Sequence, residues 1–547
     1  MFESPIRPRK NLLTALLTLR RFTQLSIVGL LYTIGLLLSS NFGVGWDEYE
    51  QRAIGTYNLI QIIRYINPEL VPSRFSYFPI LDNLKDGGYQ THGAWFEMLL
   101  GIFERILGIE SDRSIFMMRH GLTFTFVFFG IVNLAIFLKG LTKSMWVTLV
   151  SVSILITSPR LFSDSFYNSK DMIFFSMICI GLNITRIYLK YQNKRFLVLQ
   201  AVVIGLTAGV RLAGIILIVI FTIIVIIKPP LPVIDIIQRI RVGFGFILIS
   251  GVTLIVSMPY LWKNPFVRLL DIVSRNTQFE WNGNVLFNGS LISAKHLPWT
   301  YLPIWICITT PLLYLLCAFF GLVLSAIFVI QRYKDKMFTF ESEQISLLAY
   351  LVFGFFCFIA VIIENSVLYD GWRHFYFIYP LLICLSSICL KWLFVKIHER
   401  AIFKIFVILI FAQIILVSSW MVRNFPMTNL YFSPIISGQP ALKWEMDYWG
   451  LGNLEALKWI LEYDSRQTVT VSAISSTPLV QSLKLMQSNE ISRLDLRREI
   501  KSPEYLINNF RGLRKPEISM DIDGYRLVKT FAVDKSVYLQ IYKIDRS

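Results

Sequence analysis

Charged residues are scarce in this sequence. Only 16% of its 547 residues are Asp, Glu, Lys or Arg, whereas 54% are hydrophobic, and the mean hydropathy is +0.56. This balance excludes a soluble globular protein. The apolar residues form repeated runs of roughly 17 to 25, the length that an α-helix needs to cross about 30 Å of hydrocarbon. Because lipid cannot satisfy exposed backbone groups, the sequence predicts a polytopic α-helical membrane protein.

Cysteine and histidine are also few. No two cysteines form a Cys-x-x-Cys pair and all lie in apolar runs, which indicates neither a disulfide framework nor a zinc site. His92 has no further ligands at metal spacing. Paired carboxylates leave a divalent cation open, but no complete ligand set is visible, and no other cofactor is indicated. A glycine-rich phosphate loop and internal repeats are absent. The cysteines are Cys179, Cys307, Cys317, Cys357, Cys384 and Cys389.

The 53 basic residues outnumber the 36 acidic ones and give a formal net charge of +17. Most of the surplus lies in short loops between apolar runs, where positive charge fixes membrane orientation, so we expect no nucleic-acid partner. The positive-inside rule places the N-terminus in the cytoplasm and the C-terminus outside the cytoplasmic (inner) membrane. The first apolar run follows basic residues and ends without a small-residue cleavage site, which favours a retained span over a signal peptide. The loop clusters are Lys139 and Lys143; Lys190, Lys194 and Arg195; Lys228, Arg239 and Arg241; Arg332, Lys334 and Lys336; and Lys391, Lys396, Arg400 and Lys404.

About eleven transmembrane helices are predicted. Segment 196–227 is ambiguous, because it could form one tilted helix of about 48 Å or two short helices. A single span would move three basic clusters to the outside, so we predict two helices that meet near Arg211. Gly205, Gly209 and Ala213 would let them approach closely. The predicted spans are 22–40, 115–138, 144–162, 171–189, 196–210, 212–227, 242–262, 303–330, 344–363, 375–394 and 402–422.

The chain is predicted to contain a transmembrane domain, 1–423, and a small external α/β domain, 424–547. In the second domain, long apolar runs stop and short strands appear near 468–471 and 537–542, with a helix near 454–463.

Two long loops of the transmembrane domain, 41–114 and 263–302, are predicted to be external. Segment 92–107 sets apolar residues against Glu97, Glu104 and Arg105, which is typical of an amphipathic helix on a membrane surface. Aromatic and basic residues in and beside the second loop are typical of interfacial anchors, or of contacts with lipid headgroups. These are Trp262, Lys263, Arg268, Trp281, Trp299 and Tyr301.

Acidic and basic side chains converge on the external side. Nucleotide sugars are absent there, so a glycosyl donor must arrive on a lipid. Transfer from a polyprenyl-phosphate sugar needs a carboxylate that deprotonates the acceptor hydroxyl and cations that stabilise the departing phosphate. Asp47, next to Glu48 after the first span, suits the first role. Candidates for phosphate binding are Lys170, Arg211, Arg373 and His374.

Each candidate also has a structural interpretation. Asp171, at the start of the fourth span, could be an acid favoured by the helix dipole. Lys170 and Arg373 could anchor helices at the interface by snorkelling, and His374 could pair with Asp370. Arg211 is harder to explain structurally, because it is the only charge within its long apolar segment, and anion binding or an ion pair would offset its cost.

Five motifs together resemble those of bacterial membrane glycosyltransferases of the GT-C fold, in the branch related to protein O-mannosyltransferases and to the aminoarabinose transferase that acts on lipid A (glycosyltransferase family 39). The resemblance covers nearly the whole chain. The motifs are Trp46-Asp47-Glu48, Ser165-Phe166-Tyr167-Asn168-Ser169-Lys170-Asp171, Gly209-Val210-Arg211-Leu212-Ala213-Gly214, Tyr369-Asp370-Gly371-Trp372-Arg373-His374-Phe375 and Asp447-Tyr448-Trp449-Gly450.

The convergence of acids and cations favours an inverting transferase. The resemblance implies that Asp47 is the base, with Glu48 beside it and Asp171 as the acid of the fourth span. The expected donor is a polyprenyl-phosphate-linked hexose or pentose, and the acceptor is a glycan, a lipid or a protein. The chain departs from the family at two places near the acceptor side. It has Phe425-Pro426-Met427 where relatives often carry His-Pro-Tyr, and Tyr431-Phe432-Ser433 where they carry Tyr-Phe-Asn.

Two other classes of protein fit part of the pattern. A transporter or flippase of lipid-linked sugars would also place polar residues near the membrane, but such proteins usually carry ionisable residues at mid-membrane within two repeated halves. The sequence shows neither feature. A non-catalytic assembly protein, whose external domain binds partners, is the third hypothesis.

Overall fold

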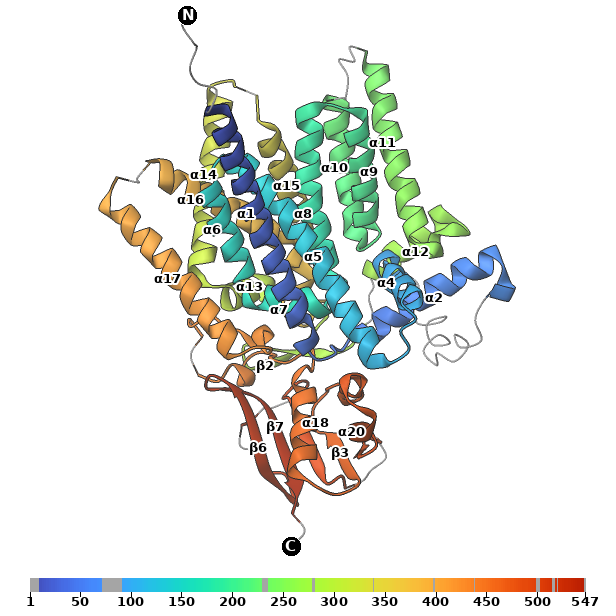
Figure 1. The fold of residues 1–547 in the computed structure, drawn as a ribbon. Coiled ribbons are helices and arrows are strands. Elements are labelled where there is room, and N and C mark those ends of the chain that lie inside the picture. The colour runs from blue at the N-terminus through green and yellow to red at the C-terminus, as the bar shows by residue number, and fades with distance from the viewer. Residues whose placement is uncertain are drawn as a thin grey trace, which may run out of the picture.

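The computed structural model describes residues 9–545 except 71–90, 229–234, 278–280, 338, 397–398, 437, 498–501, 514–516 and 519. It consists of a layer of helices and a small sheet domain at one end (Figure 1). Eight helices of this described part are long and apolar enough to cross a membrane. They are α1 (Arg9–Leu38), α5 (Asp112–Thr142), α8 (Asp171–Tyr191), α11 (Ile236–Ser257), α14 (Leu312–Lys334), α15 (Ser342–Ile363), α16 (Tyr379–Lys396) and α17 (Ala401–Arg423).

All eleven predicted spans contain helix, but not all are long enough to count as spans by themselves. α6 (Met145–Ile156) and α7 (Pro159–Tyr167) form a pair bent by 69°, which makes a ninth candidate if the pair is one span. The eighth predicted span is divided into α13 (Tyr301–Thr309) and α14, because the chain breaks before Pro311. The prediction of a polytopic helical membrane protein with a C-terminal α/β domain is confirmed.

The ambiguous segment 196–227 forms two helices, as predicted. α9 (Lys194–Ala208) and α10 (Ile215–Ile227) are separated by a short 3₁₀ turn, η5 (Leu212–Gly214), and Arg211 lies at the break. Gly205 and Gly209, however, make their close contacts with α11 and not with α10. A Cβ atom on Gly205 would lie 2.6 Å from the Ser250 carbonyl oxygen of α11, so this glycine permits close packing of α9 on α11.

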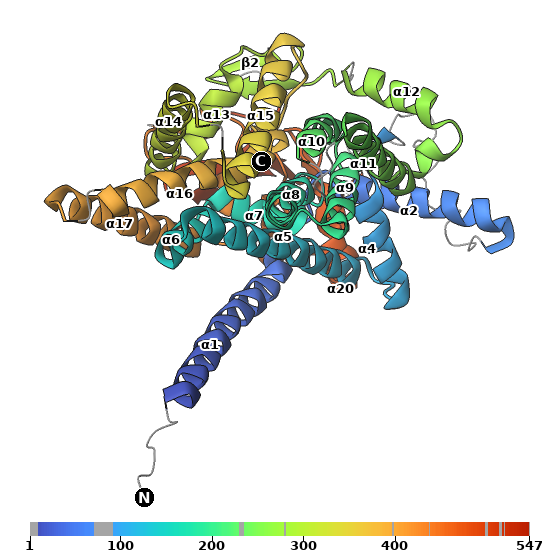
Figure 2. The same ribbon diagram turned by 90° about the horizontal axis from the view of Figure 1, so that it is seen from above.

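The centre of the helical layer is α8, the most buried of the candidate spans, which packs on α5, α9 and α15. Its buried face is almost continuously apolar, from Met172 to Leu182. α1 lies at the edge and leans away from the other helices when seen from above (Figure 2). The start of α8 is therefore held rigidly in the middle of the molecule.

The two long loops contain short elements of their own. The first loop carries η1 (Ser39–Asn41), α2 (Glu48–Ile66), η2 (Pro68–Leu70) and α4 (Trp95–Ile106), and its residues 71–90 lie outside the described residues. The second carries η6 (Pro259–Trp262), α12 (Pro265–Thr277) and an antiparallel hairpin of β1 (Asn284–Phe287) and β2 (Ser290–Ser293). Residues 278–280 of this loop lie outside the described part as well.

The predicted amphipathic helix exists as α4, but its acidic residues do not face water. Glu97 is buried and pairs with Arg119 of α5, and the Glu104 carboxylate pairs with both Arg119 and Arg52. α4 packs on α2 and α5. Its charged face is therefore used for docking to neighbouring helices.

The C-terminal domain is built on a five-stranded sheet in the order β4-β3-β5-β7-β6. β3 pairs in parallel with β4 and β5, and β7 pairs antiparallel with β5 and β6. The strands and helix expected near 468–471, 537–542 and 454–463 are present. The elements are α18 (Gly452–Tyr463), β3 (Val469–Ala473), α19 (Leu479–Ser482), η10 (Leu483–Leu485), α20 (Ser488–Ile491), β4 (Leu494–Asp495), β5 (Tyr505–Asn508), β6 (Tyr525–Val533) and β7 (Ser536–Ile544).

The domain docks on the end of the helical layer opposite the N-terminus (Figure 1). Three short turns line this junction: η7 (Arg373–Ile378), η8 (Thr428–Leu430) and η9 (Pro440–Leu442). The candidate site residues lie at the same level.

Candidate functional site

The stretch that follows α1 is pinned against the C-terminal domain. The Trp46 amide donates to the Trp449 carbonyl oxygen over 3.1 Å. A Cβ atom on Gly43 would lie 3.0 Å from the Leu451 carbonyl oxygen, so only glycine fits comfortably here. These contacts place Asp47 at the first turn of α2. The Asp47 side chain makes no capping hydrogen bond to that helix. It is 28% exposed and lines a polar cavity.

Asp47 and Glu48 are neighbours in sequence but face different surroundings. Glu48 is buried, and its carboxylate accepts from the Gly45 amide over 2.6 Å. Its other oxygen lies 2.8 Å from Nε2 of His120 in α5. Glu48 therefore shapes the turn that carries Asp47 and bonds this turn to α5. Glu48 does not line the polar cavity.

Arg373 is the centre of the site. Its guanidinium group is buried and forms ion pairs with three aspartates: Asp47 at 3.0 Å, Asp171 at 3.2 Å and Asp370 at 3.0 Å. It donates hydrogen bonds to the last two. The faces of Tyr369 and Trp449 flank it, with centroids at 5.2 and 4.7 Å. A buried cation with several charge-assisted hydrogen bonds is strongly held, so Arg373 fixes the position of all three carboxylates.

The turn before Arg373 has an unusual backbone. Asp370 and Gly371 both adopt the left-handed region, with φ of +57° and +69°. This conformation turns the Asp370 carboxylate between two arginines, since its second oxygen accepts from Arg511 over 2.5 Å. Arg511 follows β5 of the C-terminal domain and lies over the Trp46 ring at 4.9 Å. The helical and C-terminal domains are thus joined by an ion pair within the site.

Asp171 connects Arg373 to a second arginine, Arg211. Its carboxylate pairs with both Arg211 and Arg373 and also accepts from the Asn168 side chain over 3.0 Å. The side chain is almost completely buried. Asp171 is therefore committed to holding the arginines, and the interpretation of this residue as only a dipole-favoured helix acid is too narrow.

Two cavities meet at the site. The polar one, of about 460 Å³, is lined by Asp47, Asp370 and residues from the C-terminal domain. The apolar one, of about 310 Å³, extends among the helices, past Phe174 of α8 and Ile216 of α10. Five residues line both cavities and form their common border: His92, Lys170, Val367, Arg211 and His374.

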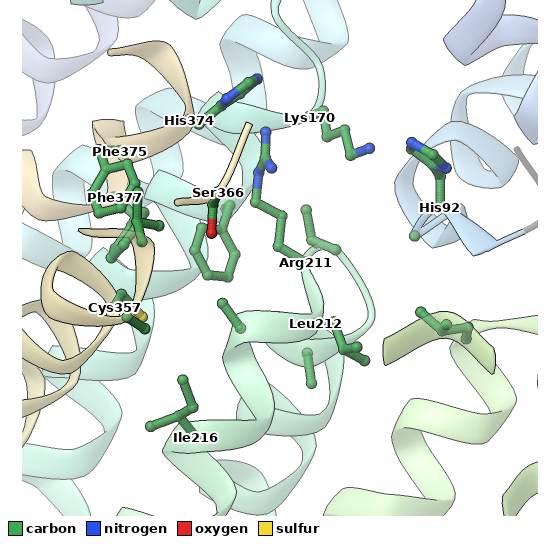
Figure 3. A pocket seen from close by; sticks show the side chains of 18 of the residues that line it. His92, Lys170, Arg211, Leu212, Ile216, Cys357, Ser366, His374, Phe375 and Phe377 are labelled. Carbon is green, nitrogen blue, oxygen red and sulfur yellow. The ribbon is translucent and has the colours of Figure 1, made fainter. Parts of the chain in front are cut away.

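Figure 3 shows the border from the side of the apolar cavity. The nitrogen-bearing ends of Lys170, Arg211 and His374 lie at one end of this cavity, and the apolar side chains of Ile216 and Leu212 lie toward the other. All four residues predicted to bind a phosphate therefore surround the site. Arg373 lines the polar cavity, and the other three lie at the border.

The pKa of Lys170 is lowered by its surroundings. Burial lowers the pKa of its ammonium group to about 7, and the neighbouring charges of Arg211 and Arg373 act in the same direction. Asp47 and Glu97 oppose this shift. An anion that binds beside this lysine raises its pKa and favours the charged form, because the anion opposes the effects of burial and of the neighbouring arginines.

The turn that carries Lys170 is bonded to α4, a contact that the sequence did not predict. The adjacent Ser169 donates its hydroxyl to Glu97, and Glu97 pairs with Arg119, all three being buried. Arg511 was also missed. The turn-forming Asn509 and Gly512 around it indicate a loop, but only the docking of the two domains brings Arg511 to Asp370.

A metal does not fit the described residues as they are arranged. Among them, no group of three or more His, Cys, Asp or Glu side chains could hold a metal ion. The aspartates that converge, Asp47, Asp171 and Asp370, already share the Arg373 guanidinium. No chemical step is therefore routed through a metal here.

No family model matches this sequence, and a search of curated proteins found no match. Solved structures of the oligosaccharyltransferase from Archaeoglobus fulgidus are similar in fold at low identity. The apo form has a TM-score of 0.45 and 12% identity over 85% of this chain. The complex with zinc and sulfate has a TM-score of 0.42 and 12% identity, over 87% of this chain and 67% of that one.

A third structure of that protein, tethered to an acceptor peptide with an NVT sequon, has a TM-score of 0.45 and 12% identity over 85% of this chain. The chain spans 63% of the length of the apo and peptide-tethered structures. At this similarity, the function of the chain has to be inferred from its own site.

Removal of the Arg373 guanidinium should destabilise the protein. We expect Arg373→Ala to lower the free energy of unfolding by about 3–5 kcal/mol, because it leaves Asp171 and Asp370 buried without their shared cation. The apparent melting temperature in detergent measures this. Arg275→Ala is the matched control, since Arg275 pairs with Asp271 at the surface and should cost about 1 kcal/mol or less. Equal melting temperatures for the two variants would contradict the central place of Arg373.

Proposed function

We propose that this protein is an inverting glycosyltransferase of the GT-C type that moves a sugar from a polyprenyl-phosphate donor to an acceptor hydroxyl. The observation that carries the proposal is the meeting of an apolar and a polar cavity at a border that includes Lys170 and Arg211, with the Asp47 carboxylate on the polar side. A lipid phosphate carrying a sugar has the same sequence of parts: an apolar chain, an anion and a polyhydroxylated ring.

The apolar cavity suits the lipid chain of the donor. Its walls come from Phe174, Ile216, Met258, Cys357 and Phe377, which belong to several different helices and turns. The phosphate would then lie at the border, where Lys170 and Arg211 donate charge-assisted hydrogen bonds. His374 lies at the same end of the cavity.

Asp47 is proposed as the general base. Its carboxylate takes the proton of the acceptor hydroxyl, and the acceptor oxygen forms a bond to the anomeric carbon from the side opposite the phosphate. The bond between that carbon and the phosphate oxygen breaks, and its electron pair leaves with the phosphate. Lys170, Arg211 and Arg373 stabilise the charge that develops there. Arg373 also holds Asp47 in position through their 3.0 Å contact.

We place the site at the external face of the cytoplasmic membrane. The C-terminal domain and the N-terminus lie on opposite sides of the helical layer (Figure 1), and the basic clusters between the spans lie on the side of the N-terminus. The positive-inside rule then makes the N-terminal side cytoplasmic.

Replacement of the proposed base tests the mechanism directly. We expect Asp47→Asn to lower kcat by about 10²- to 10⁴-fold, the usual contribution of a general base, with binding of polyprenyl phosphate retained. Transfer from a synthetic polyprenyl-phosphate sugar by the purified protein measures kcat. Glu48→Gln is the comparison: it weakens the contact with His120, so its main effect should be a lower melting temperature. Undiminished transfer by Asp47→Asn would remove this residue from the mechanism.

Donor binding should weaken as pH rises. The lowered pKa of Lys170 means that its ammonium form is present below about pH 7 and is lost above it. The Kd for a polyprenyl-phosphate sugar, a phosphodiester whose charge is constant in this range, should therefore rise severalfold from pH 6 to pH 8. Lys170→Arg should bind with a flatter pH profile, because a guanidinium stays charged throughout this range. An unchanged pH profile in this variant would show that another group controls donor binding.

Chelation should leave the reaction rate unchanged. The converging aspartates are paired with Arg373, and three guanidinium groups already supply positive charge at the site. We expect transfer after exhaustive dialysis against EDTA to equal transfer with added Mg²⁺ or Mn²⁺. A loss of activity on chelation that one of these ions restores would mean that the carboxylates release Arg373 when a metal binds.

A further inference from the structure

A third cavity is lined by Phe42 and Gly43 of the stretch that follows α1. Its volume is about 400 Å³, within the range of ligand pockets, and it shares no lining residue with the polar cavity. Its walls come from three places: the end of the first span at Asn41–Gly43, the Pro426–Met427 segment after α17, and α18 with β6 of the C-terminal domain.

α18 presents a polar and aromatic face to this cavity. Glu455, Lys458, Trp459 and Glu462 are spaced i, i+3, i+4 and i+7, which places them on one side of the helix. The residues between them fill the core of the domain on the opposite side. Trp459 also packs on the edge of that core, and Glu455 accepts from the Tyr538 hydroxyl over 3.1 Å, so these two side chains are held in place.

Trp459 offers a fixed aromatic surface. Its ring stacks on Tyr463 with the centroids 4.7 Å apart and the planes inclined by 16°. The Lys529 ammonium group of β6 lies 5.8 Å from the same ring. Phe42, Met427 and Phe531 complete an apolar floor.

The charges around this surface balance. Two carboxylates, Glu455 and Glu462, and two ammonium groups, Lys458 and Lys529, line the cavity. A strongly charged ligand would be attracted by one pair and repelled by the other. Hydroxyl groups can donate to the carboxylates and accept from the ammonium groups. A ligand with an apolar ring face and many hydroxyls, such as a neutral sugar, uses the aromatic floor and both kinds of charge together.

We propose that this cavity binds a neutral saccharide unit of the acceptor glycan, away from the hydroxyl that reacts. The inference rests on the proposed function and narrows its acceptor to a glycan. Gly43, which packs on Leu451, lines this cavity, and Trp46, which bonds to Trp449, lines the polar cavity, so both cavities lie along the same short stretch of chain. A glycan of several units held at Trp459 would keep its reactive end in the neighbourhood of Asp47.

Binding of neutral oligosaccharides by the full-length protein in nanodiscs tests this site without any donor. The probes are hexasaccharides of glucose, galactose and mannose, followed by saturation-transfer NMR. We expect at least one to bind the wild type, and Trp459→Ala to weaken its binding by at least about tenfold. Trp299→Ala, which removes an exposed tryptophan elsewhere on the external side, should bind as the wild type does. Failure of every probe to bind, or equal binding by Trp459→Ala, would overturn the proposal.

Transfer kinetics separate this site from the reaction. With a probe that serves as acceptor, Trp459→Ala should raise the acceptor KM by about tenfold and leave kcat unchanged, because the residue contacts neither donor nor base. Asp47→Asn should still bind the saccharide. If saccharide binding depends on Trp459 but no transfer occurs in any variant, the proposed function fails while the saccharide site stands.

Discussion

The Arg373 guanidinium, shared by three aspartates, is the constraint on which the site depends. Asp47 comes from the loop after the first span, Asp171 from the start of α8, and Asp370 from the turn beside Arg373 itself. A buried cation must be compensated where it lies, so these three parts of the chain are held in one arrangement. The same network reaches the C-terminal domain through Asp370 and Arg511. The domain is therefore part of the site.

The helices explain why charge and apolar surface meet at this level. α8 begins, α9 ends and η7 precedes α16 at the same end of the layer, so their polar end residues gather there. Farther from the C-terminal domain the side chains of the spans are apolar and leave a cavity among α8, α10 and α15. A ligand with an anionic head and an apolar tail matches this boundary on both sides, and Lys170, with its pKa lowered by burial, lies where the head would be.

Much of this arrangement could be predicted from the sequence. Apolar runs and basic loops predicted the helical layer. The break at Arg211 followed from the requirement that all the basic clusters lie on one side of the membrane. The positions of Asp47, Asp171 and Arg373 at span ends brought them to one side. Contacts between distant residues were beyond this reasoning: Glu48 binds His120, 72 positions away, and Asp370 binds Arg511, 141 positions away. Such pairs follow from packing, which local pattern does not determine, and they separate Glu48 from Asp47 despite their adjacency.

The central claim is that a lipid phosphate lies at the border between the two cavities, beside Asp47. A cryo-electron microscopy structure of the protein with a bound polyprenyl phosphate tests it most directly. The account predicts the phosphate between Lys170 and Arg211, with the lipid chain along Ile216 and Phe174 in the apolar cavity. A phosphate bound elsewhere on the protein, with this cavity empty of lipid, would contradict it.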